Sequence, residues 1–225
     1  VQDGDDYIIN GQKIWTSSAH VADYGWLAAR TDPDAPKHRG ISLFMLDMKS
    51  PGVSVRPIVN MAGGHEFNEV LFENVRVPKA NLVGEENQGW YTLAVALDFE
   101  RSGVGYSASA RRTLETLVTY AKETERNGKP LSEDPIVRHK LAERNNEIEV
   151  SRLLSYRVAW MQSQDMMPNA EASMSKLYGT ELTQRVAQTG MDILGLTGQL
   201  SKGSKWAPLQ GYIQRTYLNS VSSTI

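Results

Sequence analysis

The sequence predicts an α+β protein, in which a small antiparallel β-barrel or sandwich domain is followed by an antiparallel helical bundle. Residues 1–83 consist of short apolar segments separated by Gly, Pro and Asp, as is typical of antiparallel β structure. Residues 84–225 consist of long segments in which apolar residues recur at three- and four-residue steps, as in amphipathic helices. We therefore expect two domains, with their boundary between residues 83 and 84.

The composition excludes several classes of function. The net charge of -2 argues against a nucleic-acid surface, and no apolar run approaches the roughly 20 residues of a membrane span. The absence of cysteine excludes disulfides, thiolate metal sites and a cysteine nucleophile. No metal site is expected, because the four histidines stand isolated in the sequence. The first six residues lack the features of a signal peptide, and the missing initiator Met suggests a fragment.

The β-rich half is expected to begin with a hairpin. Residues 7–9 and 13–16 flank Asn10-Gly11, the strongest two-residue signal for a hairpin turn. Further strands are expected at residues 26–29, 41–46, 53–57 and 69–72.

The helical half is expected to begin with one long helix from Gly89 to about Arg126, ended by the Gly and Pro of residues 127–130. Gly103 and Gly105 fall inside this helix, where we expect them to allow close packing. Asp134-Pro135 combines a good N-cap with the residue favoured at the first helical position. Three more helices are expected, over residues 135–164, 170–194 and 207–218.

A carboxylate interrupts the apolar face of the expected long helix. Glu100 occupies the position where the next apolar residue of that face belongs. A desolvated carboxylate has a raised pKa and is a better proton acceptor near neutral pH. The alternatives are an ion pair with Arg101 or a face that reaches solvent at this point. The apolar members of the face are Trp90, Leu93, Leu97, Val104 and Ala108.

A second candidate site is the aromatic and hydroxyl cluster at Trp15, Thr16, Ser17 and Ser18. An indole with hydrogen-bonding groups beside it suits a flat heteroaromatic ring. The alternative is a core tryptophan followed by a polar strand end.

At these residues the chain resembles the acyl-CoA dehydrogenase family. Residues 11–17 resemble its G-x-K-x-W-x-[TS] strand, and residues 67–78 resemble the F-x-E-V-x-F-x-x-V-x-V-P segment that ends its middle domain. Residues 82–90 are similar to the entry of its first C-terminal helix, and residues 192–195 to its x-I-L-G turn. These segments cover nearly the whole chain in family order.

The resemblance implies a subunit with an N-terminal helical domain, a middle β-domain and a C-terminal four-helix bundle, of which this chain holds the last two, each incomplete at its outer end. It implies FAD-dependent α,β-dehydrogenation of an acyl-CoA thioester, as in fatty acid β-oxidation. It also implies an electron-transfer flavoprotein or similar electron acceptor, and a homo- or hetero-oligomer built as a dimer of dimers, with homotetramers being usual. The implied location is the bacterial cytoplasm or the mitochondrial matrix, with the cytoplasm preferred.

The resemblance assigns roles to named residues. Glu100 lies in the Leu-x-x-Glu-Arg context of one of the family's two positions for the catalytic base, the other lying just beyond residue 225. The neighbouring Phe99 and Arg101 are assigned to the substrate. Trp15 is expected against the flavin ring. Thr16 and Ser17 are expected at the edge of the ring.

The chain departs from the family where the bundle meets FAD. The family's Arg-x-x-Phe-Gly segment here has Thr124 and Asn127 in its Arg and Phe positions, with Arg126 as the substitute. At the turn that contains Gly195, Asp192 replaces a common Gln. Two alternatives therefore stay open: a non-catalytic or half-site partner subunit of a heteromer, and a flavin monooxygenase or oxidase on the same fold.

Overall fold

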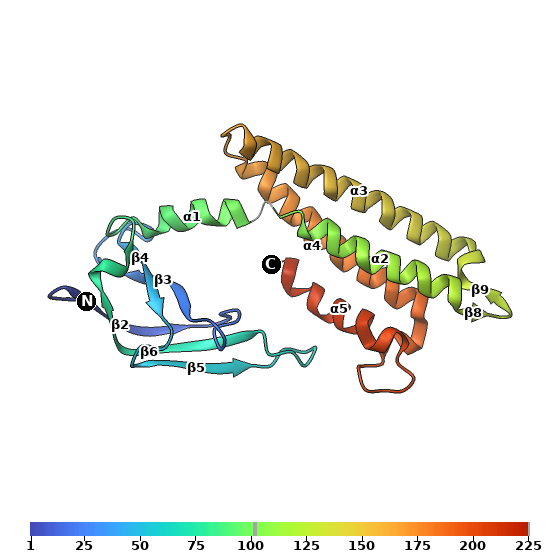
Figure 1. Cartoon of the computed structure of the whole chain (residues 1–225), viewed down its shortest axis with the longest axis horizontal. Coiled ribbons are helices and arrows are strands. Elements are labelled where there is room, and N and C mark those ends of the chain that lie inside the picture. The colour runs from blue at the N-terminus through green and yellow to red at the C-terminus, as the bar shows by residue number, and fades with distance from the viewer. Residues whose placement is uncertain (101–102, 225) are drawn as a thin grey trace. The chain divides into compact units, whose positions relative to one another are not determined.

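The computed structural model describes residues 1–100 and 103–224, with the side chains of residues 98–100 excepted. It divides into two compact units, Val1–Leu97 and Asp98–Ile225, and the description below takes each unit by itself. The first unit is mostly β and the second mostly α (Figure 1), so the predicted α+β fold is confirmed. None of the helices in the described ranges has the length and apolar character needed to cross a bilayer.

Two antiparallel sheets form the first unit. The larger has the order β1-β2-β6-β5 and the smaller the order β3-β4-β7. Apolar side chains from both sheets form one core, in which the Tyr7 and Phe44 rings lie 4.8 Å apart. The strands are β1 (Gln2–Asp3), β2 (Asp6–Lys13), β3 (Tyr24–Arg30), β4 (Ile41–Asp47), β5 (Val53–Ile58), β6 (Phe67–Pro78) and β7 (Leu82–Val83).

The predicted hairpin at Asn10-Gly11 is wrong. Strand β2 runs straight through these residues and pairs with β6, from Asp6 opposite Pro78 to Lys13 opposite Val70. The register shifts by one residue between Ile9 and Gly11, because Asn74 adds a residue with φ of 50° to β6. The Asn10 carboxamide fills this β-bulge: its Oδ1 accepts the Asn74 N–H at 2.8 Å and its Nδ2 donates to Asn74 Oδ1 at 3.1 Å.

The predicted uninterrupted helix is also wrong, because two helices replace it. Helix α1 covers Gly89–Glu100 and α2 covers Gly105–Glu123, and Gly103 between them is not helical. Glycine costs about 1 kcal/mol relative to Ala in a helix, so two glycines within three residues favour a break. A side chain at Gly105 would meet nothing within 4 Å, so the expected close packing is absent there. The apolar face through Glu100 is therefore divided between two helices.

The second unit is an antiparallel helical bundle, as predicted (Figure 1). Asp134 caps α3 (Pro135–Ser163), its Oδ1 accepting the N–H of Ile136 at 2.8 Å. Helix α4 (Asn169–Leu194) follows, and the last helix, α5 (Tyr212–Ser220), is shorter than the predicted one because a 3₁₀ turn (Pro208–Gly211) precedes it. Two-residue strands β8 (Glu125–Arg126) and β9 (Lys129–Pro130) link α2 to α3. The core of the unit includes Leu117, Ile148, Leu182 and Ile213.

Candidate active site

The segment that follows β2 has an unusual backbone. Trp15 and Ser18 adopt φ values of 63° and 58°, in the left-handed region that bulky residues rarely occupy. Such a conformation costs on the order of 1–3 kcal/mol, persists only where its surroundings hold it, and is concentrated at functional sites. Residues 15–18, which we call the Trp15 turn, are therefore a candidate site on geometric grounds.

Asn68, near the start of β6, holds the Trp15 turn. Its side chain is completely buried, and its Nδ2 donates to the Thr16 carbonyl at 3.0 Å. The backbones pair as well, because Thr16 N–H donates to Asn68 O at 2.9 Å and Asn68 N–H donates to Thr16 O at 3.0 Å. Ser18 N–H donates to Glu66 O at 2.8 Å. The turn is thus tied to β6 beyond the end of the β2–β6 ladder.

Two of the four histidines, which are isolated from each other in the sequence, meet at Asn68 in the structure. The His65 Nε2–H donates to Asn68 Oδ1 at 2.8 Å, and Asn68 Nδ2 approaches His20 Nδ1 at 3.3 Å. The imidazole rings of His20 and His65 stack with centroids 4.1 Å apart. They are 45 residues apart in the sequence, so only the β2–β6 pairing brings them together. Among the described residues no group of three or more potential metal ligands occurs.

The Trp15 turn leaves the groups that a flat ring requires accessible. The Trp15 side chain is 62% exposed and meets the Phe67 ring edge-on at 6.2 Å, so the alternative of a core tryptophan is wrong for this chain. The amide N–H and hydroxyl of Ser17 make no hydrogen bond within the described ranges, whereas the amides of Thr16 and Ser18 are occupied. An open indole beside free hydrogen-bonding groups fits the edge of an isoalloxazine ring.

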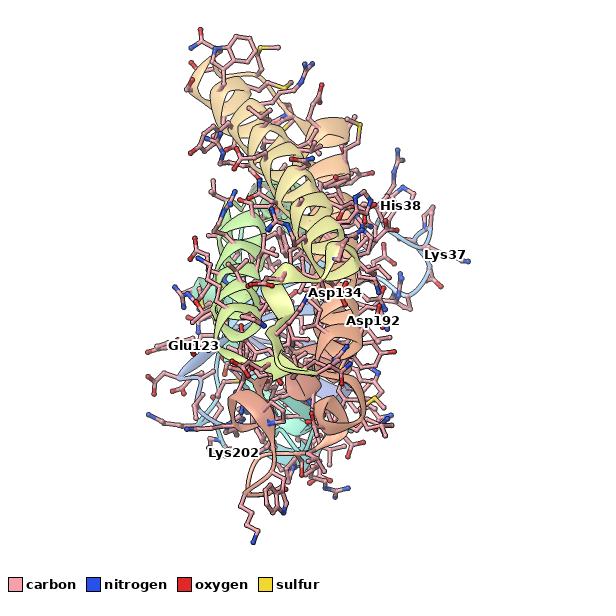
Figure 2. All side chains as sticks on the ribbon, turned by 90° about the vertical axis from the view of Figure 1, so that its right-hand side faces the viewer. Lys37, His38, Glu123, Asp134, Asp192 and Lys202 are labelled. Carbon is pink, nitrogen blue, oxygen red and sulfur yellow. The ribbon has the colours of Figure 1, made fainter. Side chains whose placement is uncertain are left out.

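A second group of predicted residues comes together at one end of the bundle. Arg126 Nη2 donates to the Ile193 carbonyl at 3.1 Å, which places its guanidinium at the turn that contains Gly195. Gly195 has φ of 62° and ends α4. Figure 2 shows this end of the bundle, with Asp134 at the start of α3 and Asp192 near the end of α4.

Lys140 compensates the acidic Asp192 at this turn, a contact that no local sequence pattern indicates. Its ammonium group lies 2.6 Å from Asp192 Oδ2, and Gln188 Nε2 donates to Asp192 Oδ1 at 3.0 Å. The hydrogen bond from Lys140 lowers the pKa of Asp192 below its ordinary value of 3.8. The carboxylate is thus engaged by α3 rather than directed toward a ligand.

The remaining predicted residues lie outside the described side chains. Helix α1 ends at Glu100, but the side chains of Phe99, Glu100 and Arg101 are not among the described residues. Their roles stay predictions.

Comparisons with known proteins agree with this architecture. Residues 1–75 match the family model "Acyl-CoA dehydrogenase, middle domain", and residues 87–225 match "Acyl-CoA dehydrogenase, C-terminal domain". Acyl-CoA dehydrogenase FadE29 of Mycobacterium tuberculosis is 39% identical over 199 residues, which are 88% of this chain and 51% of that protein. Acyl-CoA dehydrogenase FadE26 of the same organism is 38% identical over 224 residues, which are 96% of this chain and 56% of that protein.

Solved structures show the same relationship. The Tcur3481-Tcur3483 steroid ACAD matches with a TM-score of 0.89 at 36% identity, over 100% of this chain and 57% of that one. The ChsE4-ChsE5 complex from Mycobacterium tuberculosis matches with a TM-score of 0.87 at 36% identity, over 100% of this chain and 58% of that one. The chain thus spans about half the length of the relatives it matches. It belongs to the acyl-CoA dehydrogenase family.

Proposed function

We propose that this chain is part of an FAD-dependent acyl-CoA dehydrogenase that removes the α proton and the β hydride of an acyl-CoA thioester. The observation that supports this most strongly is the Trp15 turn, in which an exposed indole lies beside the free amide and hydroxyl of Ser17. In a member of this family, these groups are suited to the face and edge of a flavin.

Each proposed role follows from the chemistry of the residue. Glu100 takes the α proton, which is weakly acidic and therefore needs a desolvated, positioned base. Trp15 covers one face of the flavin site, and Ser17 and Thr16 hydrogen-bond at its edge. Phe99 and Arg101 flank the base and contact the substrate. FAD, when bound, accepts the hydride from the β carbon.

Arg126 and the Gly195 turn are proposed to bind another part of FAD. The guanidinium of Arg126 retains further N–H donors after its bond to Ile193 O. Because Lys140 neutralises Asp192, the acidic residue at this turn does not repel a phosphate as an unpaired carboxylate would. We place the domain boundary between residues 83 and 84, within the interval 76–86 that neither family model covers.

The test is Glu100→Gln, which keeps the shape of the side chain and removes the base. We expect it to retain acyl-CoA binding and to slow anaerobic bleaching of the flavin by at least about 100-fold, the lower bound for losing a general base. Glu115→Gln, at an exposed position on α2, is the matched control and should bleach at the wild-type rate. Bleaching of Glu100→Gln at the wild-type rate would place the base elsewhere. Turnover that requires an electron acceptor other than oxygen would separate a dehydrogenase from an oxidase or monooxygenase.

A half-site subunit of a heteromer is the second candidate. It is supported by Thr124 and Asn127, which replace the family's Arg and Phe, and by similarity to the ChsE4-ChsE5 complex. Under this proposal a complete FAD-binding site forms at only some of the contacts between subunits. Stoichiometric FAD in the protein produced without a partner would contradict it.

A further inference from the structure

The second unit contains a cavity of about 640 Å³ between the start of α2, α4 and α5. Two of its ten lining residues are glycines, and each of the other eight carries a hydroxyl or a carboxamide. No aliphatic or charged side chain lines it within the described part of the chain. The hydrogen bonds of six lining residues determine which groups of the wall can donate to a ligand: Tyr106, Ser109, Thr183, Tyr212, Thr216 and Ser220.

Three of these hydroxyls have already used their protons. Thr183 Oγ1 donates to Gly179 O at 3.0 Å, Thr216 Oγ1 to Tyr212 O at 2.8 Å, and Ser220 Oγ to Tyr217 O at 2.7 Å. A hydroxyl has one proton and two lone pairs. These oxygens can therefore only accept a hydrogen bond from a ligand.

The hydroxyl of Tyr212 can also only accept a hydrogen bond from a ligand, because its own proton is used elsewhere. Thr113 Oγ1 donates to Ser109 O at 3.1 Å, so its proton is not available to Tyr212. In the 2.9 Å contact between Thr113 Oγ1 and Tyr212 OH, the tyrosine is therefore the donor. Only the hydroxyls of Tyr106 and Ser109 have no hydrogen bond to the described residues and can donate to a ligand. The wall thus offers more acceptors than donors.

The cavity begins close to the proposed base. Gly103 lines it, and three residues of extended chain span at most about 11 Å, so the Gly103 Cα lies within that distance of the Glu100 Cα. Gly179 lets the first turn of α2 approach α4, since a Cβ there would lie 2.7 Å from the Cβ of Tyr106. A cavity of this size accommodates a ligand larger than a short alkyl chain.

We propose that this cavity binds the acyl group of the substrate, and that it selects a bulky acyl group bearing hydroxyls over one without oxygen. Ligand hydroxyls donate to Thr183, Thr216 and Tyr212 and accept from Tyr106 and Ser109. A purely hydrocarbon group would remove these oxygens from water without replacing their hydrogen bonds, which is unfavourable. The assignment of the ligand as an acyl-CoA rests on the proposed function, whereas the preference for hydroxyls follows from the residues that line the cavity.

The test compares three CoA thioesters with one carbon skeleton: cholanoyl-CoA without ring oxygens, cholyl-CoA with three hydroxyls, and dehydrocholyl-CoA with three ketones in their place. Binding to the purified chain supplied with FAD is measured by calorimetry. We expect cholyl-CoA to bind at least about tenfold more tightly than cholanoyl-CoA, as a few net hydrogen bonds imply. Dehydrocholyl-CoA should fall between them, because a ketone only accepts hydrogen bonds and, among the hydroxyls of the wall, finds donors only at Tyr106 and Ser109.

The variant Thr183→Val/Thr216→Val removes two acceptors while keeping β-branched side chains. It should reduce the preference for cholyl-CoA over cholanoyl-CoA by about tenfold, by weakening the binding of cholyl-CoA and by removing polar oxygens that oppose the binding of cholanoyl-CoA. Thr183→Ser/Thr216→Ser keeps the hydroxyls and should preserve the preference, as should Thr116→Val. Thr116 is a control on α2 outside the cavity, with the same bond from its hydroxyl to a backbone carbonyl, Arg112 O at 2.9 Å.

The inference would be overturned if the three thioesters bound equally well or if none of them bound. It would also be overturned if the double valine variant kept the full preference for cholyl-CoA over cholanoyl-CoA. Flavin bleaching without a hydroxyl preference would overturn it and leave the proposed function intact. A hydroxyl preference without bleaching by any acyl-CoA would support it and count against the proposed function.

Discussion

Asn68 is the residue on which the Trp15 turn depends. It is completely buried, and its one carboxamide contacts the Thr16 carbonyl and both histidines. The orientation of the amide fixes the proton positions around it: His65 donates from Nε2, and His20 presents an unprotonated Nδ1. Residues that lie far apart in the sequence are therefore joined in one hydrogen-bonded cluster around Asn68.

Replacing Asn68 by Ala should destabilise the first unit by about 1–3 kcal/mol, because the buried contacts of its carboxamide with the Thr16 carbonyl and the two histidines are lost. The amides of Thr16 and Ser18 should exchange hydrogen faster. Denaturant unfolding and amide exchange measure the two effects. Asn10→Ala is the control, since it removes an exposed carboxamide in the neighbouring strand and should cost less. Equal losses in the two variants would show that Asn68 does not hold the turn.

The sequence indicated the exposed part of this candidate site but not the part that supports it. Trp15 and Ser17 were predicted because an aromatic side chain beside hydroxyls has a recognisable chemistry. Asn68, His20 and His65 were missed because their contacts depend on the pairing of β2 with β6, which no local spacing encodes. Lys140 was missed for the same reason, since its contact with Asp192 depends on how α3 packs against α4.

At the scale of elements, two Asn-Gly pairs show the limit of local prediction. Asn127 and Gly128, with φ of 54° and 74°, form the two-residue turn between β8 and β9. Asn10-Gly11 has the same letters but lies inside β2, where the tertiary partner β6 outweighs the turn preference. The strand positions and the capped start of α3 were predicted because several local signals agree there. The break after α1 was missed because the apolar periodicity continues across Gly103.

The ion pair that joins α3 to α4 gives a pH prediction. Lys140 lowers the folded-state pKa of Asp192 below 3.8, so the pair stabilises the protein above that pH. This contribution is lost as the pH falls through the folded-state pKa. Both side chains are more than one third exposed, so the contribution should be below about 1 kcal/mol.

Lys140→Met should raise the carboxyl pKa of Asp192, as followed by NMR titration, and should reduce the loss of stability between pH 6 and pH values below 3.8. Lys202→Met makes the same change of charge at an exposed loop position (Figure 2) and should leave the pKa of Asp192 as it is. A pKa of Asp192 that does not respond to Lys140→Met would contradict the role of the ion pair.

At the scale of the whole molecule, the two units have separate cores. Leu46 belongs to the core of the first unit and Leu117 to that of the second, and each is at most 1% exposed. Truncating either to Ala should cost about 2–5 kcal/mol. Hydrogen exchange read by mass spectrometry should rise in β2, β4 and β6 for Leu46→Ala, and in α2, α3 and α4 for Leu117→Ala. A uniform rise over both units in either variant would show that they unfold together.

The residue in the position of the family's Arg bears on whether the protein can complete an FAD site without a partner. Thr124, in the position of the family's Arg, has an extended backbone with φ of -104° and ψ of 127°, which any residue adopts. Its N–H donates to Tyr120 O and its carbonyl accepts from Leu131 N–H, each at 2.9 Å, so a longer side chain leaves the backbone bonds in place. Arg126 already donates to Ile193 O, so it replaces the missing guanidinium only in part.

If the chain is a half-site subunit, Thr124→Arg should tighten FAD binding to the protein alone by about tenfold or more, since a charge-assisted hydrogen bond is worth about 1.5–3 kcal/mol. FAD titration followed by flavin fluorescence measures this. Thr116→Arg adds the same charge at a partly exposed position of α2 and controls for general attraction of an anion. If both variants tighten binding equally, the effect is one of charge alone. If the unmodified protein already holds one FAD per chain, Thr124 does not limit the site and the half-site proposal is wrong.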